Sequence, residues 1–232
     1  IKLWGFQPIA DWVCSLSDSV DVPVALHLDH CKDLDVIQGC IDAGWTSVMF
    51  DGSALPFKEN IRQTKMAYNL TTEAGVGLEA EIGAIGGTED DKFVAEDDAI
   101  LAVVDDCVEF CRNFPDLAVF APAIGTAHGV YKGEPKIAYD RLEEITSLVD
   151  IPIALHGGTG LSPDQFSRCI KSGCAKVNIS TMHKLQFIEG FTALKKDKPN
   201  LGEPIPFIDA QYEQMKSGVK DMIALFSSAG KA

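Results

Sequence analysis

Apolar runs alternate with stretches of helical periodicity along most of the chain. The runs that predict strands lie at 22–30, 45–50, 76–82, 117–124, 151–155 and 175–179. Before and between them, apolar residues recur at helical spacing over 7–20, 33–43, 56–73, 96–113, 139–149 and 162–172. The stretch after 181 is helical in pattern and is broken by Pro and Gly residues over 198–206. Strands that alternate with helices predict a parallel sheet.

Two parallel folds fit six strand–helix units. An open doubly wound sheet is complete with six strands, whereas a (β/α)₈ TIM barrel needs two more. If the fold is a barrel, the first one to two βα units are missing from this chain, and a start at Ile1 without Met agrees with that expectation. No change of composition separates the units, so one domain is predicted over 1–232, with a C-terminal helical segment over about 183–232.

Charge and composition restrict the partners. The net charge is −14, which makes the surface a poor match for nucleic acid or an anionic membrane. An anionic substrate would therefore need local binding charges. The sequence shows no apolar run long enough to span a membrane and no secretory signal. Seven cysteines without a CxxC pair predict reduced thiols in a cytoplasmic protein, with Cys31 as the candidate reactive thiol beside His30.

Polar residues stand where the predicted strands end. These residues are Asp29-His30, Asp51, Glu81, His128, His156 and Asn178. Ligands bind at the carboxyl ends of parallel strands, so we expect these side chains to share one site. Any one histidine could simply be a satisfied core residue, but three at equivalent positions favour a zinc site with an open fourth position.

Two glycine- or hydroxyl-rich turns lead into helices, at 157–160 and 178–181. Backbone N–H groups at helix N-termini bind anions, so the turns predict a phosphate site. Lys132 could add positive charge, although a solvated lysine is equally expected. The glycine-rich acidic loop 83–91 fits either a mobile lid that carries a proton-transfer group at Glu89 or a plain surface loop.

Five segments together resemble one known motif set. They are His27-Leu28-Asp29-His30, Leu78–Asp90, Ala123–Pro135, His156–Gly160 and Lys176–Thr181. In this order and spacing they resemble the class II, metal-dependent ketose-bisphosphate aldolases, which include the fructose- and tagatose-1,6-bisphosphate aldolases. The resemblance runs from about residue 22 to 181.

The resemblance implies a (β/α)₈ barrel, a homodimer or homotetramer, a Zn²⁺ ion, and a sodium or potassium ion near the phosphate. Carried over by position, it implies zinc ligands at His30, His128 and His156, and an alternative metal position at Asp51 and Glu81. It implies that Asp29 exchanges a proton with the C4 hydroxyl and that Glu89 handles the proton on the dihydroxyacetone phosphate carbon. The residues implied in phosphate or substrate binding are Gly129, Lys132, Gly157, Gly158, Thr159, Asn178, Ser180 and Thr181.

Two departures from the family pattern bear on function. The family's first strand and most of its second, which carry substrate contacts, have no counterpart here. Ser180 stands where several fructose-bisphosphate enzymes have Asp or Asn. A small residue at this position is more like the tagatose-type members. The implied reaction is cleavage of fructose or tagatose 1,6-bisphosphate to dihydroxyacetone phosphate and glyceraldehyde 3-phosphate. The alternatives are another phosphorylated keto sugar such as a deoxy-keto-gluconate phosphate, a non-catalytic stabilising subunit, or a different metal-dependent barrel enzyme.

Overall fold

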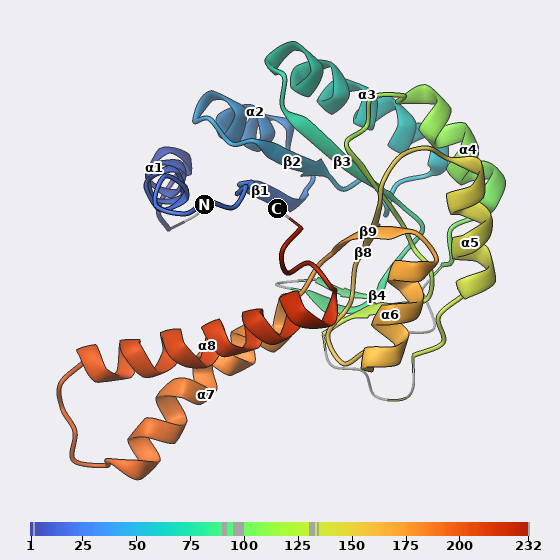
Figure 1. Cartoon of the computed structure of the whole chain (residues 1–232). Helices are drawn as coiled ribbons and strands as arrows, with labels where there is room; N and C mark the ends of the chain where they lie inside the picture. The colour runs from blue at the N-terminus through green and yellow to red at the C-terminus, as the bar shows by residue number, and fades with distance from the viewer. Residues whose placement is uncertain (2, 90–91, 95–99, 130–132, 134, 232) are drawn as a thin grey trace.

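The six predicted strands pair in one parallel sheet (Figure 1). The computed structural model describes residues 1, 3–89, 92–94, 100–129, 133 and 135–231. The strands of the main sheet are β1 (His27–Cys31), β2 (Ser47–Phe50), β3 (Gly77–Ile82), β6 (Val119–Pro122), β8 (Ile153–Leu155) and β9 (Cys174–Val177). Every pair in this sheet is parallel.

Strand order distinguishes the two candidate folds. The order in the sheet is β1-β2-β3-β6-β8-β9, so each strand lies beside the next main-sheet strand in the chain. A doubly wound sheet reverses direction at a switch point, whereas a barrel adds each strand on the same side. The order is therefore that of a partial (β/α)₈ barrel. Among the described residues β9 and β1 do not pair, so the sheet remains open.

Helices cover the outer face of the sheet and extend beyond it (Figure 1). They are α1 (Phe6–Ser17), α2 (Leu34–Asp42), α3 (Phe57–Ala74), α4 (Val104–Asn113), α5 (Tyr139–Leu148), α6 (Pro163–Lys171), α7 (Thr181–Asp197) and α8 (Ile205–Leu225). Local signals fix several ends. Ser162 and Gln165 form a reciprocal capping box at the start of α6, and Gly75 ends α3 in the left-handed conformation. No helix in the described part of the chain is long and apolar enough to cross a membrane.

Two predicted elements differ from the structure. The helix expected over 96–113 begins only at Val104, and Ile100 instead forms a bridge with Ala84. The expected loop 83–91 contains β4 (Gly86–Glu89), which pairs with β5 (Lys92–Val94) and with β7 (Ala127–His128). This small sheet begins just past the end of β3, at the edge where the predicted site residues gather.

The apolar core lies between the main sheet and its helices. Phe110 of α4 packs against Phe114, which directly follows α4, and against Phe120 of β6, with ring centroids 4.9 and 5.6 Å away. All three are fully buried. Burying one such side chain contributes roughly 1.5–3 kcal/mol, so this packing holds α4 against the sheet. The opposite face of the sheet is different, because Glu79, Glu81 and His156 are buried there.

Helices α7 and α8 form an antiparallel hairpin that projects from the barrel (Figure 1). We call residues 181–225 the arm. Close packing joins its helices: a Cβ at Gly190 would come within 2.6 Å of the Ala210 carbonyl oxygen, so glycine lets the two backbones approach. Phe191 and Phe207 also pack across the hairpin, with ring centroids 4.8 Å apart.

Candidate active site

The end of β1 departs from regular strand geometry. Leu28 is in register with Val48 and Cys31 with Phe50, so β1 has one more residue than β2 between these pairs. The extra length is absorbed by a bulge in which His30 has a φ of 47°. Adjacent strand residues normally point to opposite faces. The bulge therefore lets both Asp29 and His30 reach the interior edge of the sheet.

Three histidines from different strands meet at this edge. His30 Nε2 lies 3.0 Å from His156 Nδ1, and the His128 ring is 5.1 Å from the His30 ring between centroids. One ring nitrogen from each histidine falls within a set whose members all lie within 4.8 Å of one another. Two nitrogens on one tetrahedral Zn²⁺ would lie roughly 3.3–3.4 Å apart. The three side chains therefore fit one zinc ion.

Buried carboxylates surround His30. Its Nδ1 lies 3.3 Å from Asp51 Oδ2 and 3.8 Å from Glu81 Oε2. Burial, together with the nearby Asp51 charge, raises the pKa of Glu81 to about 8. Glu81 Oε2 is also buried without a hydrogen-bond partner. A carboxylate that is both desolvated and unpaired is what a second cation position offers.

Glu79 and Lys176 support His156 from behind. Glu79 Oε1 lies 2.6 Å from His156 Nε2, and Glu79 Oε2 lies 2.8 Å from Lys176 Nζ. Burial works to raise the pKa of Glu79, but the hydrogen bond to His156 and the Lys176 charge lower it to about 2. Burial lowers the pKa of His156, which favours the neutral imidazole that a metal requires. Glu79 thus fixes the ring with Nδ1 turned to the cluster.

Asp29 lies beside the histidine cluster with its carboxylate partly open to solvent. Its Oδ1 accepts a hydrogen bond from Asn178 Nδ2 at 3.3 Å and lies 3.7 Å from His27 Nε2. Desolvation works to raise the pKa of Asp29, but His27 and the nearby charges of His30, His156 and Lys176 lower it to about 2. Asp29 is therefore an ionised carboxylate able to accept a proton from a bound molecule.

Seven of the eight predicted phosphate residues, all but Lys132, line one small pocket. It is formed by His128, Gly129, Gly157, Gly158, Thr159, Asn178, Ser180 and Thr181. Gly157 has a φ of 69°, and a Cβ there would lie 2.6 Å from the Ala127 carbonyl oxygen. Thr159 Oγ1 accepts a hydrogen bond from Met182 N at 3.4 Å, which ties this turn to the start of α7. The pocket thus sits at a helix N-terminus, where an anion is stabilised.

The structure does not place the side chains of two predicted site residues. Lys132 lies outside the described residues, and for Glu89 the structure gives the backbone of β4 but not the side chain. The predicted reactive thiol is wrong, because Cys31 is buried and burial raises its pKa.

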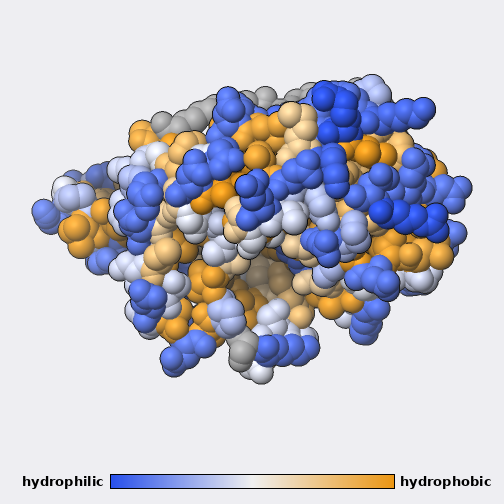
Figure 2. Space-filling model, turned by 90° about the horizontal axis from the view of Figure 1, so that it is seen from above, coloured by the Kyte–Doolittle hydropathy of each residue, from blue (hydrophilic) through white to orange (hydrophobic). Residues whose placement is uncertain are grey.

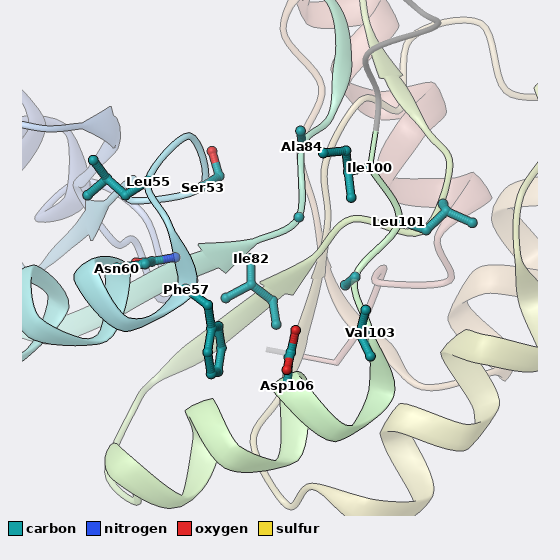
Figure 3. Close-up of a pocket in the computed structure, with 12 residues that line it drawn as sticks. Ser53, Leu55, Phe57, Asn60, Ile82, Ala84, Ile100, Leu101, Val103 and Asp106 are labelled. Carbon is teal, nitrogen blue, oxygen red and sulfur yellow. The ribbon is translucent and has the colours of Figure 1, made fainter.

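A separate pocket of about 180 Å³ opens between α3 and α4 (Figure 3). Phe57, Ile82 and Asp106 converge on it, with mostly apolar side chains around them. It contains none of the histidines or phosphate-type turns, so it is not the site that the motifs predict.

Comparison with known proteins gives the family. The profile described as "Fructose-bisphosphate aldolase class-II" matches residues 1–231. The chain belongs to the class II fructose-bisphosphate aldolase family. It is therefore an aldolase, a lyase of a class that is generally metal-dependent.

Three curated relatives of similar identity carry different names. The sulfofructosephosphate aldolase of Alkalicoccus urumqiensis is 41% identical, over 98% of this chain and 79% of the relative. The fructose-bisphosphate aldolase of Geobacillus stearothermophilus is 38% identical, over 98% and 79%. The 6-phospho-5-dehydro-2-deoxy-D-gluconate aldolase of Bacillus licheniformis is 37% identical, over 99% and 78%. Overall identity therefore does not select the substrate of this class II aldolase.

A solved structure supports the barrel assignment. The YdjI aldolase of Escherichia coli K12 superposes with a TM-score of 0.83 at 29% identity. The match covers 98% of this chain and 78% of that one. The partial barrel described above therefore matches most of the fold of a solved aldolase.

Two residues of this aldolase site were not among the predicted functional residues. Glu79 contacts His156 and Lys176 contacts Glu79, yet neither is the last residue of its strand. A signal for both was present, because each precedes a predicted site residue by two positions, Glu81 and Asn178 respectively, and alternate strand residues share a face.

Proposed function

We propose that this class II aldolase reversibly cleaves a ketose 1,6-bisphosphate with Zn²⁺ held by His30, His128 and His156. The convergence of the three imidazoles beside an ionised Asp29 carries the proposal. When bound there, Zn²⁺ would act as a Lewis acid toward charge developing on the substrate's carbonyl oxygen.

The residues around the histidines have separate tasks in the proposed reaction. The pocket over Gly157 and Thr159 holds a substrate phosphate and so sets the position of the carbonyl. Asp29 takes the C4 hydroxyl proton as the C3–C4 bond breaks, and Asn178 orients its carboxylate. Glu89 returns a proton to the carbon of the dihydroxyacetone phosphate half. Lys132 adds positive charge at the phosphate.

Two further ion positions belong to the proposal. Asp51 and Glu81 form an alternative metal position beside His30, supported by the unpaired Glu81 oxygen. A sodium or potassium ion near the phosphate pocket would offset negative charge on the substrate.

The choice of substrate is proposed from the relatives and from one residue. Fructose and tagatose 1,6-bisphosphate are the first candidates, and the small Ser180 in the phosphate pocket favours the tagatose type. Sulfofructose phosphate and a deoxy-keto-gluconate phosphate follow, because relatives of 41% and 37% identity are named for them. C4 stereochemistry depends on small differences in one pocket, so assays of all four substrates side by side decide.

Asp29→Asn tests the proposed chemistry. We expect cleavage of the best substrate to fall by about 10²–10⁴-fold, the typical contribution of a general base. Zinc content should remain at the wild-type level, because the amide keeps the shape of the side chain and Asp29 is not one of the three ligands. Metal analysis and a coupled triose phosphate assay measure both. Full activity in the variant would remove Asp29 from the reaction.

The competing function is that of a non-catalytic stabilising subunit. It predicts that the purified chain binds no zinc and that chelator changes neither its fold nor its partner binding. The retained histidines and Asp29 favour the enzyme. Chelator-sensitive cleavage that returns on adding Zn²⁺ would exclude the competing function.

A further inference from the structure

The pocket between α3 and α4 has a buried apolar floor and an exposed apolar rim (Figure 3). Ile82 and Ala102 line it as buried residues. Ile100, Leu101 and Val103 line it as large apolar side chains that are 64%, 36% and 52% exposed. A molecule that enters the pocket and covers these side chains removes apolar surface from water, which favours binding. The lining therefore suits a ligand with an apolar body.

The volume of the pocket limits the size of that body. An apolar protein cavity of about 150 Å³ holds a benzene molecule. The pocket between α3 and α4 measures about 180 Å³, so it has room for about seven or eight heavy atoms. A single ring or a short branched chain with one polar group fits this space, whereas a sugar bisphosphate is too large for it.

One carboxylate gives the pocket its charge. Asp106 is the only charged residue among the described residues that line it, and in Figure 3 its carboxylate points from α4 toward Ile82. Asp105 and Asp106 both stand in the first turn of α4, so their charges outweigh the roughly half positive charge of the helix N-terminus. Arg141 donates Nη1 to the Ala102 carbonyl oxygen at 2.8 Å, and the described contacts contain no ion pair between Arg141 and Asp106. The pocket therefore attracts a cation.

The other polar side chains of the lining are already bonded within the protein. Ser53 Oγ donates to Asp51 Oδ1 at 2.6 Å. Asn60 Nδ2 donates to the Glu81 carbonyl oxygen at 2.8 Å, and Asn60 Oδ1 accepts from Thr64 Oγ1 at 2.9 Å. A ligand with several polar groups would leave some of them unpaired in the pocket, which costs affinity. One cationic group on an apolar body is the chemistry that the lining satisfies.

We infer that this pocket binds a small primary amine, with the ammonium group at Asp106 and an apolar body of about benzene size against Phe57 and Ile82. The pocket also covers a junction in the fold, because Ala84 and Ile100 both line it. Each of these two residues donates its backbone N–H to the carbonyl oxygen of the other, at 2.8 and 3.0 Å. The bound amine lies over this bridge and resists its opening.

Isothermal titration calorimetry of the purified full chain with benzylamine tests this inference. Benzylamine has the required size and is protonated at neutral pH. We expect one site with a dissociation constant on the order of 1 mM, an ordinary affinity for so small a ligand. Benzyl alcohol keeps the ring without the charge and should bind about five- to tenfold more weakly, whereas the benzoate anion should bind more weakly still. Benzoate binding as tightly as benzylamine, or no heat from benzylamine, would overturn the inference.

Asp106→Asn shows whether the amine binds at this carboxylate. The amide keeps the shape of the side chain, so the variant should weaken benzylamine binding about five- to tenfold and leave benzyl alcohol binding unchanged. Asp105→Asn is the matched control, because it removes the same charge from the same turn of α4 at a residue that does not line the pocket. Equal weakening by the two variants would mean that the acidic chain as a whole attracts the amine, and the site would be wrong.

Hydrogen exchange separates this pocket from the apolar surface of the arm. Exposed apolar side chains are visible at the free end of the arm, at the left of Figure 2, and offer an aromatic ring a second surface. At ten times its dissociation constant, benzylamine should slow exchange of the Ala84 and Ile100 amides about tenfold, because opening of their bridge releases the ligand. Amides of α7 and α8 should not change. Protection confined to the arm, or none at Ala84 and Ile100, would contradict the proposed site. Neither measurement depends on aldolase activity.

Discussion

Lys176→Met tests whether Lys176 supports the proposed metal centre through Glu79. Methionine is unbranched and one atom shorter than lysine, so it keeps most of the apolar stem and removes the charge. The Lys176 ammonium lies 2.8 Å from Glu79 Oε2 and donates to Asn178 Oδ1 at 2.7 Å. Without it, the nearest side-chain nitrogen to Glu79 Oε2 in the described contacts is His27 Nε2 at 3.6 Å. The variant therefore leaves Glu79, whose side chain is 1% exposed, with one weak contact at Oε2, while Oε1 keeps its 2.6 Å hydrogen bond to His156.

The expected loss of stability follows from burial. Breaking a buried ion pair by removing one partner costs about 3–5 kcal/mol. Lys176 retains 31% exposure, so water can enter and lower the cost to roughly 1–3 kcal/mol. At about 2–4 °C per kcal/mol for a chain of this size, the melting temperature should fall by roughly 2–12 °C. Zinc affinity should fall about tenfold, the lower end for residues that orient a ligand, because Lys176 acts one step behind Glu79.

Urea unfolding and chelator competition measure the two effects separately. Unfolding in excess chelator reports the ion pair alone, and competition with a chromophoric chelator reports zinc affinity. Lys171→Met, an exposed lysine on α6, is the matched control. Glu79→Gln in the Lys176→Met background should recover part of the stability, because the buried charge is then gone. If Lys176→Met matched Lys171→Met in both measurements, the support assigned to Lys176 would be wrong.

Three further results are expected from the same structure. Removing zinc should lower the melting temperature, because an ion at one hundred times its dissociation constant stabilises the folded state by about 2.7 kcal/mol. Thermal unfolding with and without chelator measures this difference. Gly157→Ala should lower the free energy of unfolding in urea more than Gly44→Ala does, and it should also raise KM. Both glycines have positive φ, but only Gly157 has a backbone atom within 3 Å of the added Cβ. Phe120→Ala should cost about 3–5 kcal/mol in urea unfolding, because its ring is fully buried against Phe110, whereas Phe187→Ala on the arm should cost the monomer far less.

The fold could largely be predicted from local patterns, since six strands and their helices each have a clear period and marked ends. Ser162 with Gln165, and Gly75 after α3, show how short-range chemistry sets such ends. The exceptions depend on distant partners. The small sheet uses Gly86 and Gly87, which have low strand propensity, and exists because residues 127–128 lie beside them. Ile100 has helical spacing to Val103 but instead pairs with Ala84.

Some residues of the candidate site could be predicted from the sequence, whereas others depend on distant partners. His30, His128 and His156 could be placed together from sequence, because the carboxyl ends of parallel strands meet at one edge. The ion pair behind His156 could not be predicted. Strand spacing places Glu79 and Lys176 on the face of the site, but it gives no sign that a glutamate and a lysine 97 positions apart will be 2.8 Å apart. Residues at strand ends are therefore easier to predict than the partners that hold them.

The bulge at His30 depends both on the local sequence and on contacts with distant residues. An alternating strand cannot present two successive side chains to one site, so Asp29 and His30 can act together only if the backbone turns between them. The φ of 47° at His30 and the extra residue in β1 supply that turn. A left-handed conformation at a non-glycine residue costs on the order of 1–3 kcal/mol and persists only where surrounding contacts hold it. The contacts here are the 3.4 Å hydrogen bond from His30 N to Met49 Sδ and the ring's contacts with Asp51 and His156. A metal bound by the ring would add to them, so metal binding and the local backbone conformation should stabilise each other.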